Sequence, residues 1–212
     1  MVATVVSEAD HERVTAAIRE AERRTSGEIF AVLARASDDY FFVCGFFAGA
    51  WVLSAGLLAA AVTAIAGFTL NGLLLLATMG LAYALLVLLF AWVPALRMWA
   101  VPASVARRRA EGNAARQFLA HGITETRERT GVLIFVSLAE RHAQVVADSG
   151  IDAVVDDTVW REAVDRLSRN AAEGTIAEGF LEAIAVCADV LAEHFPAGPE
   201  PRGELDDRLV EL

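Results

Sequence analysis

The sequence contains no lysine. All 18 of its basic residues are arginine, and 28 acidic residues bring the net charge to −10. Nucleic acids are bound by clustered basic surfaces, because the phosphate backbone has to be neutralised. We therefore expect no nucleic acid among the partners of this chain. The absence of lysine also indicates a GC-rich bacterial genome.

Cysteine is scarce, and the usual enzyme signatures are missing. With only Cys44 and Cys187, neither a disulfide framework nor a Cys-x-x-Cys metal motif can be built. The four histidines include no i, i+4 pair, and there is no glycine-rich phosphate loop, G-x-S-x-G elbow or H-E-x-x-H sequence. Residues 1–25 lack the apolar segment of a signal peptide, so we expect the N-terminus to stay in the cytoplasm.

Charge is absent from one long stretch, residues 41–96, which has no Asp, Glu, Lys, Arg or His. A bilayer core requires about 20 apolar residues per helix, so this stretch is long enough for two crossings. Gly67 and the pair Asn71-Gly72 mark a turn in the middle. The sequence therefore predicts a transmembrane hairpin with spans at about 41–65 and 73–94.

Basic residues follow the second span, at Arg97 and then at Arg107, Arg108 and Arg109. The positive-inside rule places such membrane-flanking arginines in the cytoplasm. Two crossings return the chain to the side that it left. We therefore expect a multi-pass protein of the bacterial inner membrane with both termini cytoplasmic.

The hairpin is predicted to be an anchor in the lipid bilayer. It contains no Asp, Glu, Lys, Arg or His side chain, which excludes a proton relay or an ion path within the spans. Gly45 and Gly49 have the GxxxG spacing that allows close helix packing, so we also expect a homodimer contact through the hairpin.

The segments on either side of the hairpin, residues 1–40 and 97–195, each carry part of an α/β pattern. The apolar run Glu28 to Ala34 reads as a strand buried on both faces, and nothing before the hairpin can pair with it. Its partners must come from beyond the hairpin. We expect further elements at 8–24 (helix), 103–120 (helix), 132–138 and 144–147 (strands joined by a tight turn), a helix capped by residues 156–158 and ending at Gly174, 176–194 (helix) and an extended tail over 196–212.

One acidic cluster stands out in this pattern. Asp148, Asp152, Asp156 and Asp157 follow the third run of apolar residues, and Glu28 opens the first strand, where it faces the same edge of the sheet if the strands pair as expected. Carboxylates at such spacing suit Ca²⁺ or Mg²⁺. Aspartate is also favoured in turns and at helix N-caps. Both interpretations, a metal site or a turn followed by a cap, remain open at this point.

Two motifs carry a family resemblance. Residues 24–29 (RTSGEI) precede the first strand, and residues 129–141 (RTGVLIFVSLAER) span the second. These motifs, together with the end of the last helix at residues 193–196, resemble the TPM domain family. That family is named for a thylakoid lumen protein, a photosystem II repair protein and a modulator of a nicotinic receptor. The chain is similar to its short bacterial members, in which the spans fall between the first strand and the rest of the domain.

The resemblance implies a fold and leaves two functions open. It implies a small mixed sheet of about four strands flanked by helices, interrupted here by the hairpin. Some members of the family are proposed to be acid phosphatases or to bind Ca²⁺, and others act as auxiliary subunits of membrane complexes. We therefore expect either a non-enzymatic adaptor for a membrane-protein partner or a metal-dependent phosphoester hydrolase. At Asp148-Ser149-Gly150-Ile151 the chain departs from the glycine-rich turn of the longer members.

Overall fold

The chain forms two compact units in the computed structural model, which describes residues 6–69, 71–156, 158–198, 205 and 208–212. The first, called here the sheet unit, consists of Met1–Ser37 and Arg107–Leu212. The second, called here the hairpin unit, is Asp38–Ala106. The sheet unit is therefore assembled from segments on both sides of the hairpin unit.

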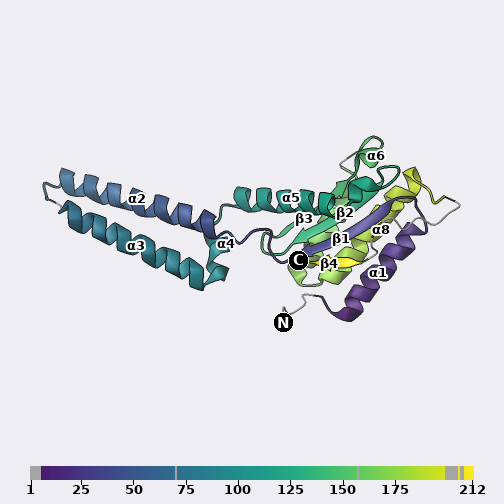
Figure 1. The fold of residues 1–212 in the computed structure, drawn as a ribbon, viewed down its shortest axis with the longest axis horizontal. Helices are drawn as coiled ribbons and strands as arrows, with labels where there is room; N and C mark the ends of the chain where they lie inside the picture. The colour runs from purple at the N-terminus through teal and green to yellow at the C-terminus, as the bar shows by residue number, and fades with distance from the viewer. Residues whose placement is uncertain (1–5, 70, 157, 199–204, 206–207) are drawn as a thin grey trace. The chain divides into compact units, whose positions relative to one another are not determined.

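A mixed four-stranded sheet forms the centre of the sheet unit, with the strand order β3-β2-β1-β4 (Figure 1). Strand β1 lies parallel to β2 and to β4, and β2 is antiparallel to β3. The α/β fold and the pairing of the first strand with a strand beyond the hairpin are confirmed. The strands are β1 (Glu28–Ala34), β2 (Gly131–Ser137), β3 (His142–Ala147) and β4 (Leu209–Glu211).

The parallel pairing of β1 with β2 explains where the hairpin is inserted. Two parallel strands cannot be joined by a tight turn, and they require a crossover connection, which is usually a helix. Helix α5 (Ala103–Ala120) supplies that crossover, and its Ala114 and Phe118 pack under the sheet. The hairpin is thus an insertion into a connection that the fold needs in any case.

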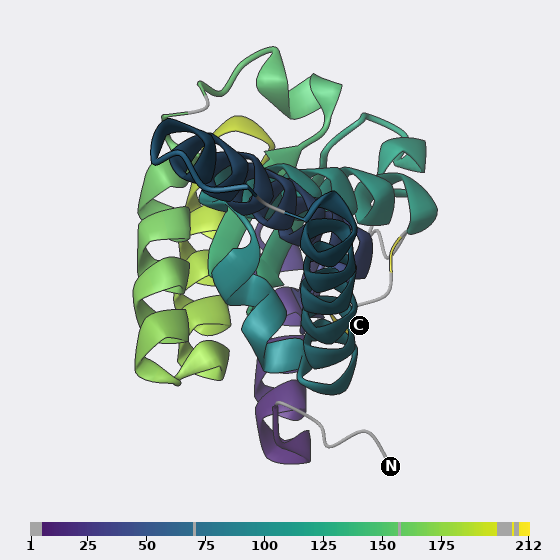
Figure 2. The same cartoon turned by 90° about the vertical axis from the view of Figure 1, so that its left-hand side faces the viewer.

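One face of the sheet is covered by three long helices. The alternate residues Ile29, Ala31 and Leu33 of β1 point into this larger core, as the period of two in a strand requires. Figure 2 shows two of the covering helices, α7 and α8, side by side. The helices of this face are α1 (Glu8–Glu22), α7 (Trp160–Glu173), α8 (Ile176–His194) and the short α6 (Ser149–Asp152).

The opposite face carries the remaining residues of the same strands. Phe30, Val32 and Ala34 of β1 pack there with α5 and with Ile123, which belongs to the 3-10 helix η2 (Ile123–Glu125). All seven residues of β1 and all seven of β2 are buried. The two apolar runs in the sequence are therefore explained by a strand pair that is covered on both faces.

Two long helices make up most of the hairpin unit. Helix α2 is Phe41–Ile65 and helix α3 is Gly72–Trp92, and both are long and apolar enough to span a membrane. Their bounds agree closely with those expected from the sequence. The short η1 (Pro94–Leu96) and α4 (Arg97–Ala100) follow.

The glycines of α2 face α3 inside the same hairpin. A Cβ at Gly49 would lie 3.5 Å from the Tyr83 ring, and one at Gly56 would lie 2.3 Å from the sulfur of Met79. Gly45 is also near Tyr83, at 3.9 Å from its hydroxyl oxygen. The GxxxG spacing thus has an explanation within one chain, and a homodimer through the hairpin stays a prediction.

One expectation about a helix end is wrong. Helix α7 begins at Trp160, and its N-cap is Val159, which makes no side-chain capping bond. Asp156 instead closes a tight turn by accepting a hydrogen bond from the backbone N–H of Thr158 at 2.8 Å. The C-terminal tail was expected to be extended, and within it Leu209–Glu211 pairs with the centre of β1 as strand β4.

Candidate functional site

The expected acidic site lies at the edge of the sheet where β1 and β2 begin and β3 ends. Glu28 is paired with Gly131, and the backbone N–H of Asp148 donates to the Gly131 carbonyl at 2.9 Å. Glu28 and Asp148 therefore occupy the same row of the sheet, one on each side of a glycine. The two residues therefore lie at the same edge of the sheet.

Asp148 is almost completely buried, and one of its oxygens is unused. Its side chain is 5% exposed, and Oδ1 accepts hydrogen bonds from the backbone N–H and the hydroxyl of Ser149 at 2.7 and 3.2 Å. No described residue donates a hydrogen bond to Oδ2. Arg129 Nη1 lies 3.7 Å from Oδ1. A buried carboxylate oxygen without a partner is costly, which marks this residue as a candidate for binding.

Glycine at position 150 is what allows this corner to close. A Cβ there would lie 2.3 Å from the Glu128 carbonyl oxygen and 2.6 Å from that of Arg129. The Gly150 N–H in fact donates to the Arg129 carbonyl at 3.0 Å. Arg129 itself has a φ of +57°, a conformation that non-glycine residues rarely adopt. The start of α6 is therefore packed directly on the backbone that precedes β2.

Glu28 does not converge with Asp148 over the intervening glycine. Its Oε2 accepts a hydrogen bond from the backbone N–H of Leu205 at 3.3 Å. Ile123 covers Gly131 so closely that a Cβ on the glycine would lie 2.3 Å from the Ile123 side chain. An apolar side chain thus occupies the space above the row between the two carboxylates.

The other aspartates of the cluster have separate roles. Asp152 ends α6, and the hydrogen bond that the Thr158 backbone donates to Asp156 lowers the pKa of that carboxyl. Asp157 lies outside the described residues. Among the described residues, no group of three or more His, Cys, Asp or Glu side chains is arranged to hold a metal ion. The described acids therefore do not fit a metal centre as a set.

The arginines that were expected to flank the membrane lie in two different elements. Arg97 donates to three backbone carbonyls of the hairpin unit, those of Phe90, Asp39 and Ala91. The cluster of three lies on α5, where Arg107 forms an i, i+4 ion pair with Glu111 at 2.7 Å. Arg97 therefore links the end of α3 to the segment that precedes α2 by hydrogen bonds.

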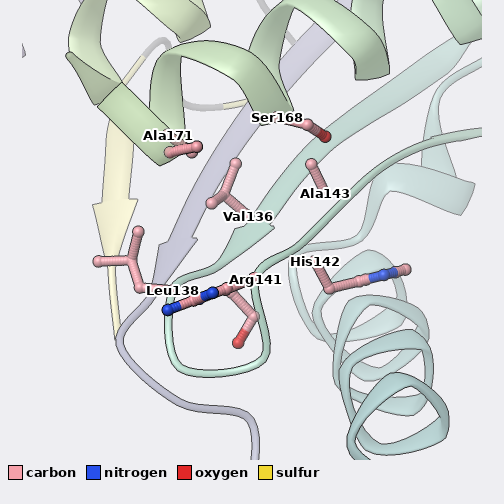
Figure 3. A pocket seen from close by; sticks show the side chains of 9 residues that line it. Val136, Leu138, Arg141, His142, Ala143, Ser168 and Ala171 are labelled. Atoms are coloured by element: carbon pink, nitrogen blue, oxygen red, sulfur yellow. The ribbon is translucent and has the colours of Figure 1, made fainter. Parts of the chain in front are cut away.

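A second candidate site lies at the opposite end of the sheet, beside the turn that joins β2 to β3. A cavity of about 440 Å³ opens there between the turn and α7 (Figure 3). The sequence predicts the turn between β2 and β3, but it does not predict the cavity. The pattern Glu140-Arg141-His142 shows a turn, but the positive φ of Arg141, +50°, and the approach of α7 leave no mark in the sequence.

Comparison with known proteins supports the family resemblance. The sequence model of the TPM domain matches residues 96–190. Residues 96–190 therefore have the sequence pattern of a TPM domain. The match runs from the base of the hairpin into α8, and it leaves out β1 and β4, which the structure adds to the same sheet as the matched β2 and β3. No curated protein matches the sequence.

One solved structure shares the TPM fold of this chain. It is the NMR structure of the BA42 protein from the psychrophilic bacterium Bizionia argentinensis, with a TM-score of 0.62 and 17% sequence identity. The likeness covers 100% of this chain and 98% of the BA42 chain. At this level of identity the similarity establishes the fold alone.

Proposed function

We propose that the protein is a membrane-anchored adaptor, in which the TPM domain docks on a membrane-protein partner and assists its assembly, turnover or regulation. The single observation behind this proposal is the position of the hairpin. It is inserted between the central strand β1 and the crossover helix α5, so the domain is covalently fixed to its anchor at two points.

The exposure of the hairpin helices supports insertion into a bilayer. Leu57 and Leu74 are 64% and 63% exposed, and no residue of α3 is buried. Surfaces of this size and apolarity do not remain in water, because soluble proteins rarely expose large contiguous apolar patches. A bilayer satisfies them without a protein partner, because each helix satisfies its own backbone.

The topology has its own test. Fusions of alkaline phosphatase to Met1 and to Leu212 should both be inactive if the protein lies in the bacterial inner membrane with cytoplasmic termini, as the arginines behind the second span indicate. Activity at either end would contradict the proposed hairpin.

The adaptor proposal is tested by affinity capture from membranes that are cross-linked before solubilisation in mild detergent. The full chain should recover at least one membrane protein reproducibly. The hairpin unit alone, Asp38–Ala106, is the matched control, because it keeps the anchor and lacks the TPM domain. Equal recovery by both, or recovery of no reproducible membrane protein, would count against the proposal.

Phosphoester hydrolysis with a divalent ion is the second candidate, and one observation favours it. Asp148 is a buried carboxylate with an unpartnered oxygen beside an arginine; the carboxylate oxygen is a ligand suited to a divalent ion, and the arginine attracts a phosphate. Calorimetry with Ca²⁺ and with Mg²⁺ should then show binding to the full chain that Asp148→Asn removes. A generic phosphoester should be hydrolysed, and EDTA should stop the reaction. Absent or EDTA-insensitive turnover would exclude this candidate.

A further inference from the structure

The cavity beside the β2–β3 turn has the size of a small-molecule site and walls of two kinds. Its volume of about 440 Å³ falls within the range of roughly 300–1,000 Å³ that is usual for ligand pockets. The apolar wall belongs to the margin of the larger core. The polar groups are Arg141 from the β2–β3 turn and the Ser168 hydroxyl from α7. The residues that line the cavity include Val136, Leu138, Arg141, Ala143, Ser168 and Ala171.

The arginine is the cation of the site, and no described residue supplies it with a counter-ion. Within the described part of the chain, the Arg141 guanidinium makes no hydrogen bond and no ion pair, whereas Arg13 and Arg24 are each paired with a carboxylate at 2.7 Å. Figure 3 shows the Arg141 side chain extending beneath Leu138. A guanidinium beside an apolar wall favours an anion with two or more oxygens, which it binds bidentately.

The neighbouring polar groups are engaged elsewhere and do not neutralise Arg141. Glu140 accepts hydrogen bonds from the Ser137 hydroxyl and, at 2.9 Å, from the backbone N–H of Ser37. The His142 imidazole bonds to Gln144 at 2.8 Å, and Figure 3 shows it extending away from Arg141. An anion in the cavity would therefore meet one available cation.

The apolar wall specifies the rest of the ligand. The wall is formed by Val136, Leu138 and Ala143, which belong to β2, β3 and the turn between them. Ala171 faces them from α7. These side chains offer carbon surface and no polar group of their own. A ligand that fills the cavity needs an apolar part next to its anionic end.

We propose that this cavity binds an anionic amphiphile, with a phosphate or carboxylate group on Arg141 and an apolar chain along Val136, Leu138, Ala143 and Ala171. The site goes beyond the adaptor role and does not depend on it. Only three residues separate Ser37, which bonds to the Ser137 wall of the cavity, from α2. This short tether to a membrane-spanning helix makes a lipid headgroup one source of the anion, and a soluble phosphate ester is the other.

The test uses the full chain in a neutral detergent, with butyl phosphate and inorganic phosphate as calorimetric probes. Butyl phosphate should bind more tightly than inorganic phosphate, because only the former covers the apolar wall. Arg141→Gln should weaken butyl phosphate at least about tenfold, the usual effect of losing a hydrogen bond to a charged group. The matched control is Arg169→Gln, which removes the same charge from an exposed arginine of α7 that does not line the cavity.

A second variant keeps the test valid if the arginine variant does not fold. Ala171→Leu fills the apolar end, so it should weaken butyl phosphate at least about tenfold and change inorganic phosphate less than about twofold. A thermal melt of each variant confirms folding. Equal losses in Arg141→Gln and Arg169→Gln, or equal affinities for the two probes, would overturn the proposal, as would the absence of saturable binding.

The source of the anion is decided in nanodiscs. If a lipid headgroup occupies the cavity, phosphatidic acid in the disc should lower the apparent affinity for butyl phosphate relative to pure phosphatidylcholine, and Arg141→Gln should abolish this competition. If a soluble ester is the ligand, the affinity should be the same in both discs and should still depend on Arg141. Competition that persists in Arg141→Gln would show that lipid acts elsewhere and would contradict the site.

Discussion

The sheet unit and the hairpin unit are both rich in apolar residues, but the sheet unit buries them and the hairpin unit exposes them. Leu133 in β2 is fully buried, whereas Leu81 in α3 is 61% exposed. A strand leaves its backbone unpaired until neighbours cover it, so an apolar strand is necessarily an internal element. A helix satisfies its own backbone and needs only apolar surroundings. Apolar content alone therefore does not show where a segment lies.

The two units also differ in how polar groups hold them together. In the sheet unit, Thr25 accepts from the Gly27 N–H and donates to the Phe195 carbonyl, which ties the motif before β1 to the end of α8. In the hairpin unit, Arg97 performs a similar task by donating only to backbone carbonyls. The comparison predicts that the sheet unit folds without the hairpin, and that each unit responds to its own substitutions.

The largest effect should come from removing the hairpin in two different ways. A chain in which Ser37 is joined to Ala103 through a Gly/Ser linker keeps β1 and should form a soluble, folded α/β domain, because loop closure costs grow only slowly with length. Residues 103–212 alone lack the strand that pairs with both β2 and β4, so this fragment should aggregate.

Circular dichroism and a cooperative thermal melt distinguish the two chains. A fragment that melts as cooperatively as the linked chain would show that α1 and β1 are not part of the core. The division into one sheet unit and one hairpin unit would then be wrong.

A pair of matched leucine substitutions gives the next largest effect. Leu133→Ala removes a fully buried side chain from β2 and should lower the free energy of unfolding by about 2–5 kcal/mol. Leu81→Ala changes an exposed side chain of α3 and should leave the melt of the sheet unit unchanged. Thermal melts in one neutral detergent check both, and a similar loss in the two variants would contradict the separation of the units.

Much of this fold was predictable from the sequence, because its strongest signals are local. The charge-free run and its glycine turn gave α2 and α3 nearly to the residue, and the strand Glu28 to Ala34 was predicted with its observed bounds. The reasoning that this strand needs partners from beyond the hairpin was also correct. In each case a run of consecutive residues indicates one physical requirement, which is either apolar length or backbone pairing.

The remainder depends on contacts between distant segments. The fourth strand has only three residues, and its pairing with β1 is decided by a buried Leu209 and by the N–H of Leu212, which donates to Leu33. Glu28 and Asp148 lie at one edge of the sheet, but Ile123 over Gly131 separates them. No local pattern indicates which side chain will cover a glycine.

A smaller effect is expected at the base of the hairpin. Arg97→Ala removes donors to the Phe90 and Ala91 carbonyls, which the last turn of α3 leaves free, and to the Asp39 carbonyl before α2. The local opening free energy should fall by about 1–3 kcal/mol, the range for hydrogen bonds to a charged group. Hydrogen exchange at the ends of α2 and α3 measures it. Arg97→Lys keeps the charge but loses the fork of donors, so full protection in that variant would show that charge alone suffices.

The smallest effect concerns pH and should be confined to the sheet unit. The Ser7 hydroxyl and the Arg13 guanidinium donate to Asp10 at the start of α1, and they lower the pKa of its carboxyl from the ordinary 3.8. A carboxyl whose pKa is lowered in the folded state contributes stability above its unfolded pKa, and loses that contribution as the pH falls through the folded value. The sheet unit should therefore lose this contribution below about pH 4.

The difference in melting temperature between the native chain and Asp10→Asn separates the contribution of Asp10 from that of other carboxyls. This difference should be present at neutral pH and should shrink on acidification. The spans contain no ionisable group that titrates in this range, so the helix content of the hairpin should not follow the same curve. A difference that stays constant down to pH 2 would show that Asp10 acts in α1 without its charge.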